Sequence, residues 1–216
     1  MNHDTDYPRA LRPPPNNVVI INNNLIQKAI DSSRISPRKR IILPFHKLPS
    51  DNLHRMLNAL QPNSYVQPHR HLDPPKAESI IVLKGAIIFI EFNNTGEIEN
   101  FCQLSSESFN IGVDIEPGIF HTFFAVVADT VLFEVKPGPY EQISDKDFAS
   151  WAPTEGSKSA FEYLRNLYEL TTNSEKLIIR FDLAEQRHRA NAEIIAFSRV
   201  CQRNPNYSGG AARARR

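Results

Sequence analysis

The feature that most constrains this sequence is a series of short, β-rich runs between residues 53 and 136, separated by turn-forming residues. The runs ESIIVLK, AIIFIEF and TVLFEVK are rich in β-branched and aromatic residues, and NNTGE at 93–97 is typical of a hairpin turn. LHRMLNAL, IENFCQL, NIGVDI and HTFFAVV are further short runs with strand character. Regularly spaced short strands with Pro and Gly turns predict an all-β sandwich or barrel.

The segment before these runs has a different character. Residues 1–16 are polar and proline-rich, which predicts a flexible arm. Asparagines flank a short apolar run at 18–21, which predicts a strand, and residues 24–34 carry apolar side chains at helical spacing. We therefore expect residues 17–45 to form a strand and a helix that pack on a barrel spanning residues 46–153.

After the barrel the pattern becomes helical. Residues 143–157 read as a covering loop, with Phe148 and Trp151 as its anchors. A C-terminal helical extension is expected over 154–203, followed by a disordered basic tail over 204–216. The first helix of the extension is predicted to present one apolar face, formed by Phe161, Leu164, Leu167 and Tyr168.

Composition excludes several classes of protein. The 216 residues contain 25 Lys and Arg against 24 Asp and Glu, so the net charge of +1 gives no bulk attraction for nucleic acid or an anionic membrane. Cys102 and Cys201 lie far apart without C-x-x-C spacing, which argues against a disulfide scaffold and a cysteine zinc knuckle. No run of 18 apolar residues and no secretory leader is visible, so we expect a cytoplasmic protein without a membrane span.

A group of metal-ligating side chains stands out within the β-rich region. His69 and His71 are two residues apart, so a strand would present both imidazoles on one face. The turn LDPPKA is expected to fold the next strand back beside them, which would place Glu78 opposite the pair. His121 opens another strand just after the Pro-Gly pair at 117–118. Three imidazoles and a carboxylate form a suitable site for one divalent transition metal, and Zn, Fe, Mn and Ni are all compatible with these ligands.

A His-x-His pair alone is more often ordinary surface or core decoration, since imidazole nitrogens are easily satisfied by hydrogen bonds. Here the combination of residues resembles the two motifs of the cupin superfamily, whose fold is a double-stranded β-helix, or jelly-roll barrel. The residues that match are His69, His71, Glu78, Gly85, Pro117, Gly118 and His121. The sequence departs from the pattern in its longer gap between His71 and Glu78, in a proline adjacent to the glycine, and in Ala125 where an asparagine is common.

The segments RMLNALQPNSYVQPHRH, PPKAES, FEVKPGPY and DKDFASWAPTEG resemble, more narrowly, the WbuC-type cupin-fold metalloproteins. That resemblance covers residues 18–168. It implies a small metal-binding cupin encoded among genes for O-antigen and other surface polysaccharides, and it implies no particular reaction.

Strand geometry suggests one catalytic residue. If residues 128–129 form a two-residue hairpin loop, Phe123 lies opposite Glu134 and His121 lies opposite Lys136, so Glu134 points toward the metal. A buried carboxyl group there would have a raised pKa and could act as a general acid or base. A register slip of one residue would turn Glu134 outward, where it would be an ordinary surface side chain.

Two further residues are candidates for substrate binding. Lys76 lies in the turn before Glu78 and could reach an anionic substrate, although a solvated loop lysine is the ordinary alternative. Tyr140 could line the barrel entrance, or simply pack there. Arg70 should face outward, and His46 and His54 are interpreted as ordinary histidines.

These observations favour a metal-dependent enzyme, isomerase-like or epimerase-like, acting on a small sugar or nucleotide-sugar. The alternatives are a non-catalytic cupin that binds or senses a ligand, and an Fe(II) dioxygenase-type cupin. Nucleic-acid binding through the C-terminal arginines is a weaker idea. We expect a carbohydrate-related ligand and a homodimer, since exposed edge strands need cover.

Overall fold

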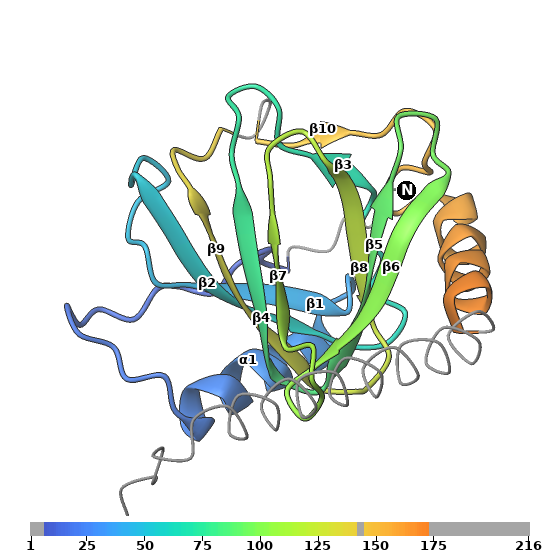
Figure 1. Ribbon diagram of the computed structural model, residues 1–216. Helices are drawn as coiled ribbons and strands as arrows, with labels where there is room; N and C mark the ends of the chain where they lie inside the picture. Colours follow the sequence, from blue (N-terminus) through green and yellow to red (C-terminus); the bar gives the residue numbers. More distant parts are fainter. Residues whose placement is uncertain (1–6, 142–144, 173–216) are drawn as a thin grey trace, which may run out of the picture. The chain divides into compact units, whose positions relative to one another are not determined.

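The computed structural model describes residues 7–141 and 145–172, and their strands form two five-stranded antiparallel sheets (Figure 1). Residues up to Leu167 belong to one compact unit, and those from Tyr168 onward belong to a second. The elements are α1 (Asn23–Ile35), β1 (Arg40–Pro44), β2 (Leu53–Leu60), β3 (His69–Arg70), β4 (Glu78–Lys84), β5 (Ala86–Phe92), β6 (Ile98–Ser105), β7 (Gly112–Ile115), β8 (Phe120–Ala125), β9 (Thr130–Pro137) and β10 (Asp147–Phe148). Residues 158–172 are also helical.

Strands that follow each other in the chain often lie in different sheets. The first sheet has the order β1-β2-β9-β4-β7 and the second has the order β10-β3-β8-β5-β6. The chain therefore crosses from one sheet to the other at every connection between successive strands except those between β1 and β2 and between β5 and β6. This confirms the predicted all-β jelly-roll fold with a C-terminal helix.

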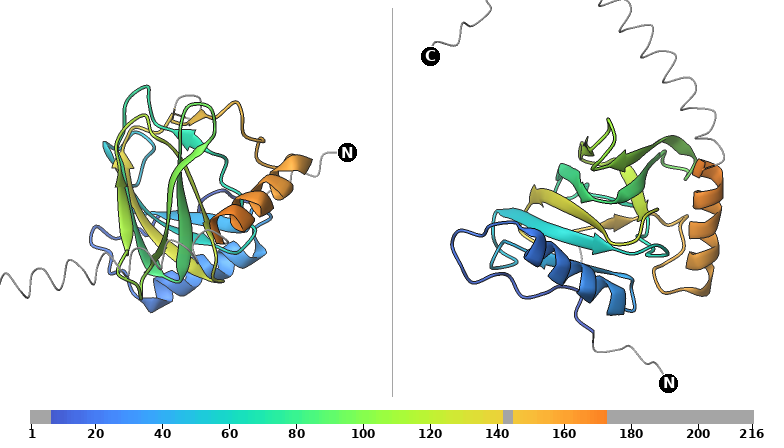
Figure 2. Two further views of the ribbon diagram at one scale, coloured as in Figure 1. Left: turned by 45° about the vertical axis from the view of Figure 1, so that its right-hand side comes forward. Right: turned by 90° about the horizontal axis from the view of Figure 1, so that it is seen from below.

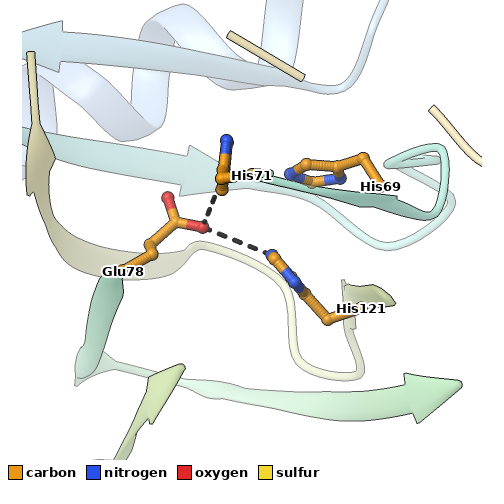
Figure 3. Close-up of side chains that lie close together, drawn as sticks. All are labelled: His69, His71, Glu78 and His121. Atoms are coloured by element: carbon orange, nitrogen blue, oxygen red, sulfur yellow. Dashed lines mark ion pairs between the residues drawn. The ribbon is translucent and has the colours of Figure 1, made fainter. Parts of the chain in front are cut away.

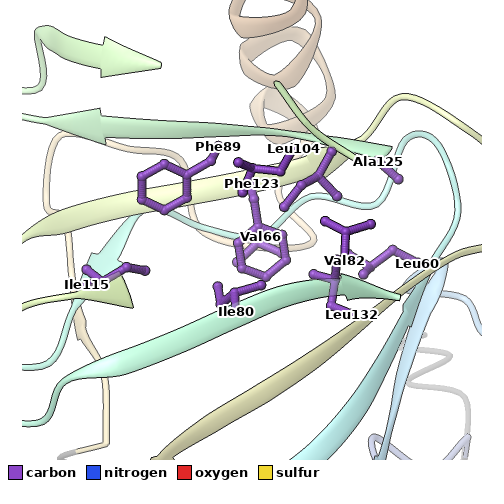
Figure 4. Close-up of a cluster of buried hydrophobic side chains, with 11 residues drawn as sticks. Leu60, Val66, Ile80, Val82, Phe89, Leu104, Ile115, Phe123, Ala125 and Leu132 are labelled. Carbon is purple, nitrogen blue, oxygen red and sulfur yellow. The ribbon is translucent and has the colours of Figure 1, made fainter. Parts of the chain in front are cut away.

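The main hydrophobic core lies between the two sheets (Figure 4). Side chains alternate along each strand, so Leu132 of β9 points into this core, whereas Val131 and Phe133 pack on the opposite face of the sheet. The buried members of the inner core are Leu60, Val66, Ile80, Val82, Ile87, Phe89, Leu104, Ile115, Phe123, Ala125 and Leu132. Polar side chains continue the inner faces of β2, β4, β8 and β9 beyond this core, and they form the candidate site.

Helices cover the outer faces of both sheets (Figure 2). Helix α1 buries Ala29 and Ile30 against β1, β2 and β9 of the first sheet. Its start is fixed by Asn22, whose side chain accepts a hydrogen bond from the backbone N–H of Leu25 at 3.1 Å. The helical segment that begins at residue 158 packs Leu164 and Leu167 against the second sheet. None of the described helices is long and apolar enough to cross a membrane.

The N-terminal region differs from the prediction. The apolar run at 18–21 forms no strand, and Val18 is 81% exposed. An earlier segment lies next to β1 instead: the backbone N–H of Leu11 donates to Ile42 O at 2.8 Å, and Ala10 forms a parallel bridge with Ile42. β-branched residues form a strand only where a neighbouring strand is free to pair with them. Here residues 10 and 11 already lie along β1.

Two details of the C-terminal prediction were also wrong. Phe148 is 51% exposed because β10 is an edge strand, so it does not anchor the covering loop, whereas Trp151 packs on Phe92 and Phe120. Phe161 is 60% exposed and Tyr168 is 46% exposed, so neither shares the buried face of Leu164 and Leu167. The rest of the helical extension to residue 203 and the basic tail at 204–216 lie outside the described residues.

Gly85 lies between β4 and β5 and provides a test of how closely this turn packs against Thr130 of β9. Its φ is +79°, and a Cβ there would clash with Thr130 Oγ1 and lie 3.0 Å from Thr130 Cα. We expect Gly85→Ala to lower the free energy of unfolding by about 2–4 kcal/mol, from backbone strain plus overpacking. Gly156→Ala is the matched control, because Gly156 has a φ of +82° with nothing within 4 Å of the added Cβ. Urea denaturation of both variants should show the larger loss for Gly85→Ala, and equal losses would contradict the clash.

Candidate metal centre

Four buried side chains from both sheets converge on one point (Figure 3). His69 lies in β3 and His121 lies directly opposite it in β8, while His71 follows β3 immediately. Glu78 is the first residue of β4, in the other sheet. Each side chain contributes one ligand atom, and these atoms all lie within 4.8 Å of one another. The sequence therefore identified a group that the fold brings together.

The route by which Glu78 arrives differs from the prediction. β3 and β4 do not form a hairpin, since β3 belongs to the second sheet and β4 to the first. The segment between them crosses from one sheet to the other, with a single bridge between Leu72 and Pro75. Glu78 is two residues before Ile80 of the core, so both side chains lie on the inner face of β4. Glu78 thus approaches the histidines across the space between the sheets.

All three imidazoles are oriented by backbone carbonyls. The Nδ1 atoms of His69 and His121 lie 2.9 Å from the carbonyl oxygens of Gln67 and Ile119, and His71 Nδ1 is hydrogen-bonded to the carbonyl of Asp145. A carbonyl oxygen only accepts, so each Nδ1 carries the proton and each Nε2 presents a lone pair. The buried Nε2 atoms of His71 and His121 have no hydrogen-bond partner, which is the state expected of metal ligands.

The electrostatics of the group also fit a cation. Glu78 Oε2 lies 3.5 Å from His71 Nε2 and 3.3 Å from His121 Nε2 (Figure 3). Burial opposes ionisation of Glu78, but the two imidazoles beside it hold its pKa well below the usual range. Burial likewise lowers the pKa of His69 well below its usual value, which keeps this imidazole neutral. A proton shared between an Nε2 atom and the carboxylate, or a metal cation in its place, would supply the positive charge that this arrangement needs.

The donor set defines what the site could hold. Three imidazole nitrogens and one carboxylate oxygen are borderline ligands, suited to Zn, Fe, Mn or Ni. His69, His71, Glu78 and His121 could therefore hold one divalent ion. Four protein ligands leave two positions for substrate or water at an ion that prefers six.

Glu134 lies inside the barrel, but not through the predicted register. β9 pairs with β2 and β4, and β8 pairs with β3 and β5, so Phe123 and Glu134 are not opposite each other. Glu134 is instead opposite Ile80 and shares the inner face with Leu132. The carboxyl group is buried and accepts a hydrogen bond from Asn58 Nδ2 at 2.6 Å. Burial and the nearby charge of Glu78 raise the pKa of Glu134 to about 7.

Lys76 is not a solvated loop lysine. It is only 4% exposed, and its ammonium group donates to Pro139 O at 2.6 Å and to Asp145 Oδ1 at 3.0 Å. Lys136 Nζ donates to the other carboxylate oxygen of Asp145 at 2.8 Å. Asp145 therefore joins two buried cations, and its backbone carbonyl orients His71. The role of Lys76 in substrate binding remains a prediction.

The weaker candidates lie at the edge of this region. Tyr140 is half-exposed, and its backbone N–H donates to Pro49 O at 2.7 Å. His54 is buried opposite Lys136 and stacks on His46 with ring centroids 4.0 Å apart, and neither belongs to the ligand group. Arg70 faces away from the metal centre, as predicted, and lies over the ring of Phe120.

Sequence reasoning missed Asn58, Asp145 and Lys146. Asn58 follows the alternation of β2, so a correct pairing of β2 with β9 would have placed it beside Glu134. Asp145 and Lys146 lie just before β10, which has only two residues and no recognisable strand pattern. Asp145 and Lys146 precede Phe148 by three and two residues. A predicted pairing of Phe148 with His69 would have been the signal that brings them to the site.

Three comparisons with known proteins complete this description. A family model described as a domain of unknown function, DUF6016, matches residues 21–104. No curated protein matches the sequence.

Solved structures with similar folds include the capsular polysaccharide assembling protein CapF from Staphylococcus aureus, at 20% identity and a TM-score of 0.41, covering 50% of this chain and 28% of CapF. A variant of oxalate decarboxylase from B. subtilis has 15% identity and a TM-score of 0.39, covering 50% of this chain and 27% of the decarboxylase. KdgF from Halomonas sp. has 17% identity and a TM-score of 0.35, covering 48% of this chain and 80% of KdgF. The chain spans less than a third of the length of CapF and the decarboxylase.

Proposed function

We propose that this protein is a metal-dependent enzyme that isomerises or epimerises a small sugar or nucleotide-sugar. The observation that carries the proposal is Glu134, a buried carboxyl group on the same inner face as the metal centre. Glu134 is not one of the four ligands, so its acid–base chemistry stays available. A site that only stored a metal would not need a second, protonatable carboxyl group beside it.

The reaction class follows from what Glu134 can do. Isomerisation and epimerisation next to a carbonyl group both begin with removal of a proton from carbon and end with its return. With a pKa of about 7, Glu134 exists in both protonation states near neutrality, so it can accept this proton and give it back. A divalent ion held by the four ligands would supply Lewis-acid polarisation of the carbonyl oxygen.

The surrounding side chains support this role. The hydrogen bond from Asn58 Nδ2 holds one oxygen of Glu134 and leaves the other oxygen able to face a substrate. The carbonyl groups behind the imidazoles hold each Nε2 toward the centre. The choice of a sugar substrate rests on the resemblance to WbuC-type cupins, which are encoded with genes for surface polysaccharides.

Loss of proton transfer in Glu134→Gln is the expected result that tests this proposal. The protein would be purified without chelators, loaded with metal, and incubated in D₂O with a panel of aldoses, ketoses and keto-sugar nucleotides, each of which carries a carbonyl group. NMR would follow exchange of the proton next to the carbonyl group. We expect the wild type to exchange at least one substrate and Glu134→Gln to be slower by about 100-fold or more, with unchanged metal content.

Glu99→Gln is the matched control, because Glu99 is exposed on β6 and its substitution should leave exchange unchanged. If the metal-loaded wild type catalyses no exchange on any member of the panel, the enzymatic proposal fails. A non-catalytic binding cupin would then be the better description. Exchange that persists in Glu134→Gln would remove Glu134 from the mechanism.

A further inference from the structure

Lys146 is directed toward the metal centre by the pairing of β10 with β3. In this pairing Phe148 lies opposite His69, and their ring centroids are 6.1 Å apart. Directly opposed residues of an antiparallel pair share a face, and residues two apart along a strand do the same. Lys146 immediately precedes β10, and carrying this alternation one residue beyond the strand places it on the face that carries the imidazole of His69.

The ammonium group of Lys146 is unlike those of its two neighbouring lysines. Lys76 and Lys136 are both paired with Asp145. Lys146 makes no hydrogen bond or ion pair with any residue in the described ranges, and it is partly exposed. Desolvation and the charge of Lys136 lower the pKa of Lys146 to about 8, although the charges of Glu78 and Glu134 act to raise it. The Lys146 charge in turn lowers the pKa of His69. Lys146 is thus a cation close to the metal centre that faces the charges of Glu78 and Glu134 but is hydrogen-bonded to neither.

The charges of the region do not balance once a metal is bound. Three ammonium groups, from Lys76, Lys136 and Lys146, face the carboxylates of Glu78 and Asp145. Glu134 adds a negative charge only when it is ionised, and a divalent ion adds two positive charges. The region is then positive in either state of Glu134. Positive charge in a poorly solvated site favours an anionic partner.

We propose that the site takes a small carboxylate, and that Lys146 is the residue that binds this carboxylate and selects for it. The inference rests on the metal centre of the proposed function. A carboxylate is favoured over a phosphate because Lys146 offers one unpaired ammonium group, while Asp145 already occupies Lys76 and Lys136. A monoanion matches that single cation, and a phosphate dianion would need further donors.

The proposal predicts that ligand binding depends on both the carboxylate and Lys146. Isothermal titration calorimetry on the full-length, metal-loaded protein would compare galacturonate with galactose, two sugars that differ only in the carboxylate at carbon 6, and would include glycolate and inorganic phosphate. We expect galacturonate or glycolate to bind, galactose to bind at least about tenfold more weakly, and Lys146→Met to weaken carboxylate binding by about tenfold or more. Lys146→Arg should retain most of the affinity, since the charge is kept.

Lys28→Met, on the exposed side of α1, is the matched control and should bind as the wild type does. Metal content of each variant, measured by elemental analysis, separates loss of the metal from loss of Lys146. The inference is overturned if neither carboxylate binds, if galactose binds as well as galacturonate, if phosphate binds more tightly than both acids, or if Lys146→Met binds like the wild type. Carboxylate binding without proton exchange would instead remove the enzymatic proposal and leave this one standing.

Discussion

His121→Ala is expected to abolish stoichiometric binding of a divalent metal. His121 Nε2 is buried, lacks a hydrogen-bond partner and lies 3.3 Å from the Glu78 carboxylate, so it is placed to ligate an ion together with Glu78. Removal of a residue that merely orients a ligand typically weakens metal binding about 10–100-fold, and loss of the ligand itself should exceed that range. Elemental analysis after dialysis, followed by competition with a zinc-sensitive dye, would measure metal content and affinity.

The control for this prediction is His54→Ala. His54 is also buried on an inner strand face, but it belongs to the stacked pair with His46 and not to the ligand group. His54→Ala should lower stability and leave metal affinity close to that of the wild type. Equal metal affinity in His121→Ala and the wild type would show that the four side chains do not form a metal site, and the proposed function would fall with it.

Asp145→Ala should cause the largest loss of stability among the variants considered, about 3–5 kcal/mol in the free energy of unfolding. The substitution leaves the buried ammonium groups of Lys76 and Lys136 without the carboxylate that both contact. The two cations lie on either side of Asp145 and hold its pKa below the usual value against the effect of burial. Urea denaturation of the metal-free protein would measure the loss without a contribution from metal binding.

Asp147→Ala is the comparison that isolates burial. Asp147 is two residues further along the chain and pairs with Arg70 at 2.6 Å, but nearly half of its side chain is exposed. An exposed ion pair of this kind contributes about 0–1 kcal/mol, so Asp147→Ala should be nearly neutral. If Asp145→Ala costs no more than Asp147→Ala, the two lysines are not held in a buried network.

The four candidate metal ligands could be predicted from the sequence because each depends on local geometry. Strand alternation places His69 and His71 on one side of the chain, and alternation along β4 aligns Glu78 with Ile80 of the core. The short strands between Leu53 and Pro137 were likewise visible as β-branched runs. These inferences needed only the residue period and the positions of Gly and Pro.

The pairing of strands could not be predicted in the same way. The two-residue loop expected after β8 would have joined β8 to β9, whereas the chain actually crosses between sheets there. Glu134 nevertheless points inward, since its face follows from alternation with Leu132 and not from its partner strand. Lys76 looked like a loop lysine because its counterion, Asp145, lies far away in the sequence and becomes its neighbour only in the folded chain.

The origin of the ligands in two sheets has a consequence for folding. Three donors belong to one half of the jelly roll and the fourth to the other, so a bound ion would act as a clasp between the halves. Because the complete set of ligands exists only in the folded state, metal binding would stabilise that state alone. The melting temperature should therefore rise with the concentration of free metal. If the supply of metal fell, the folded protein would lose this stabilisation along with any metal-dependent activity.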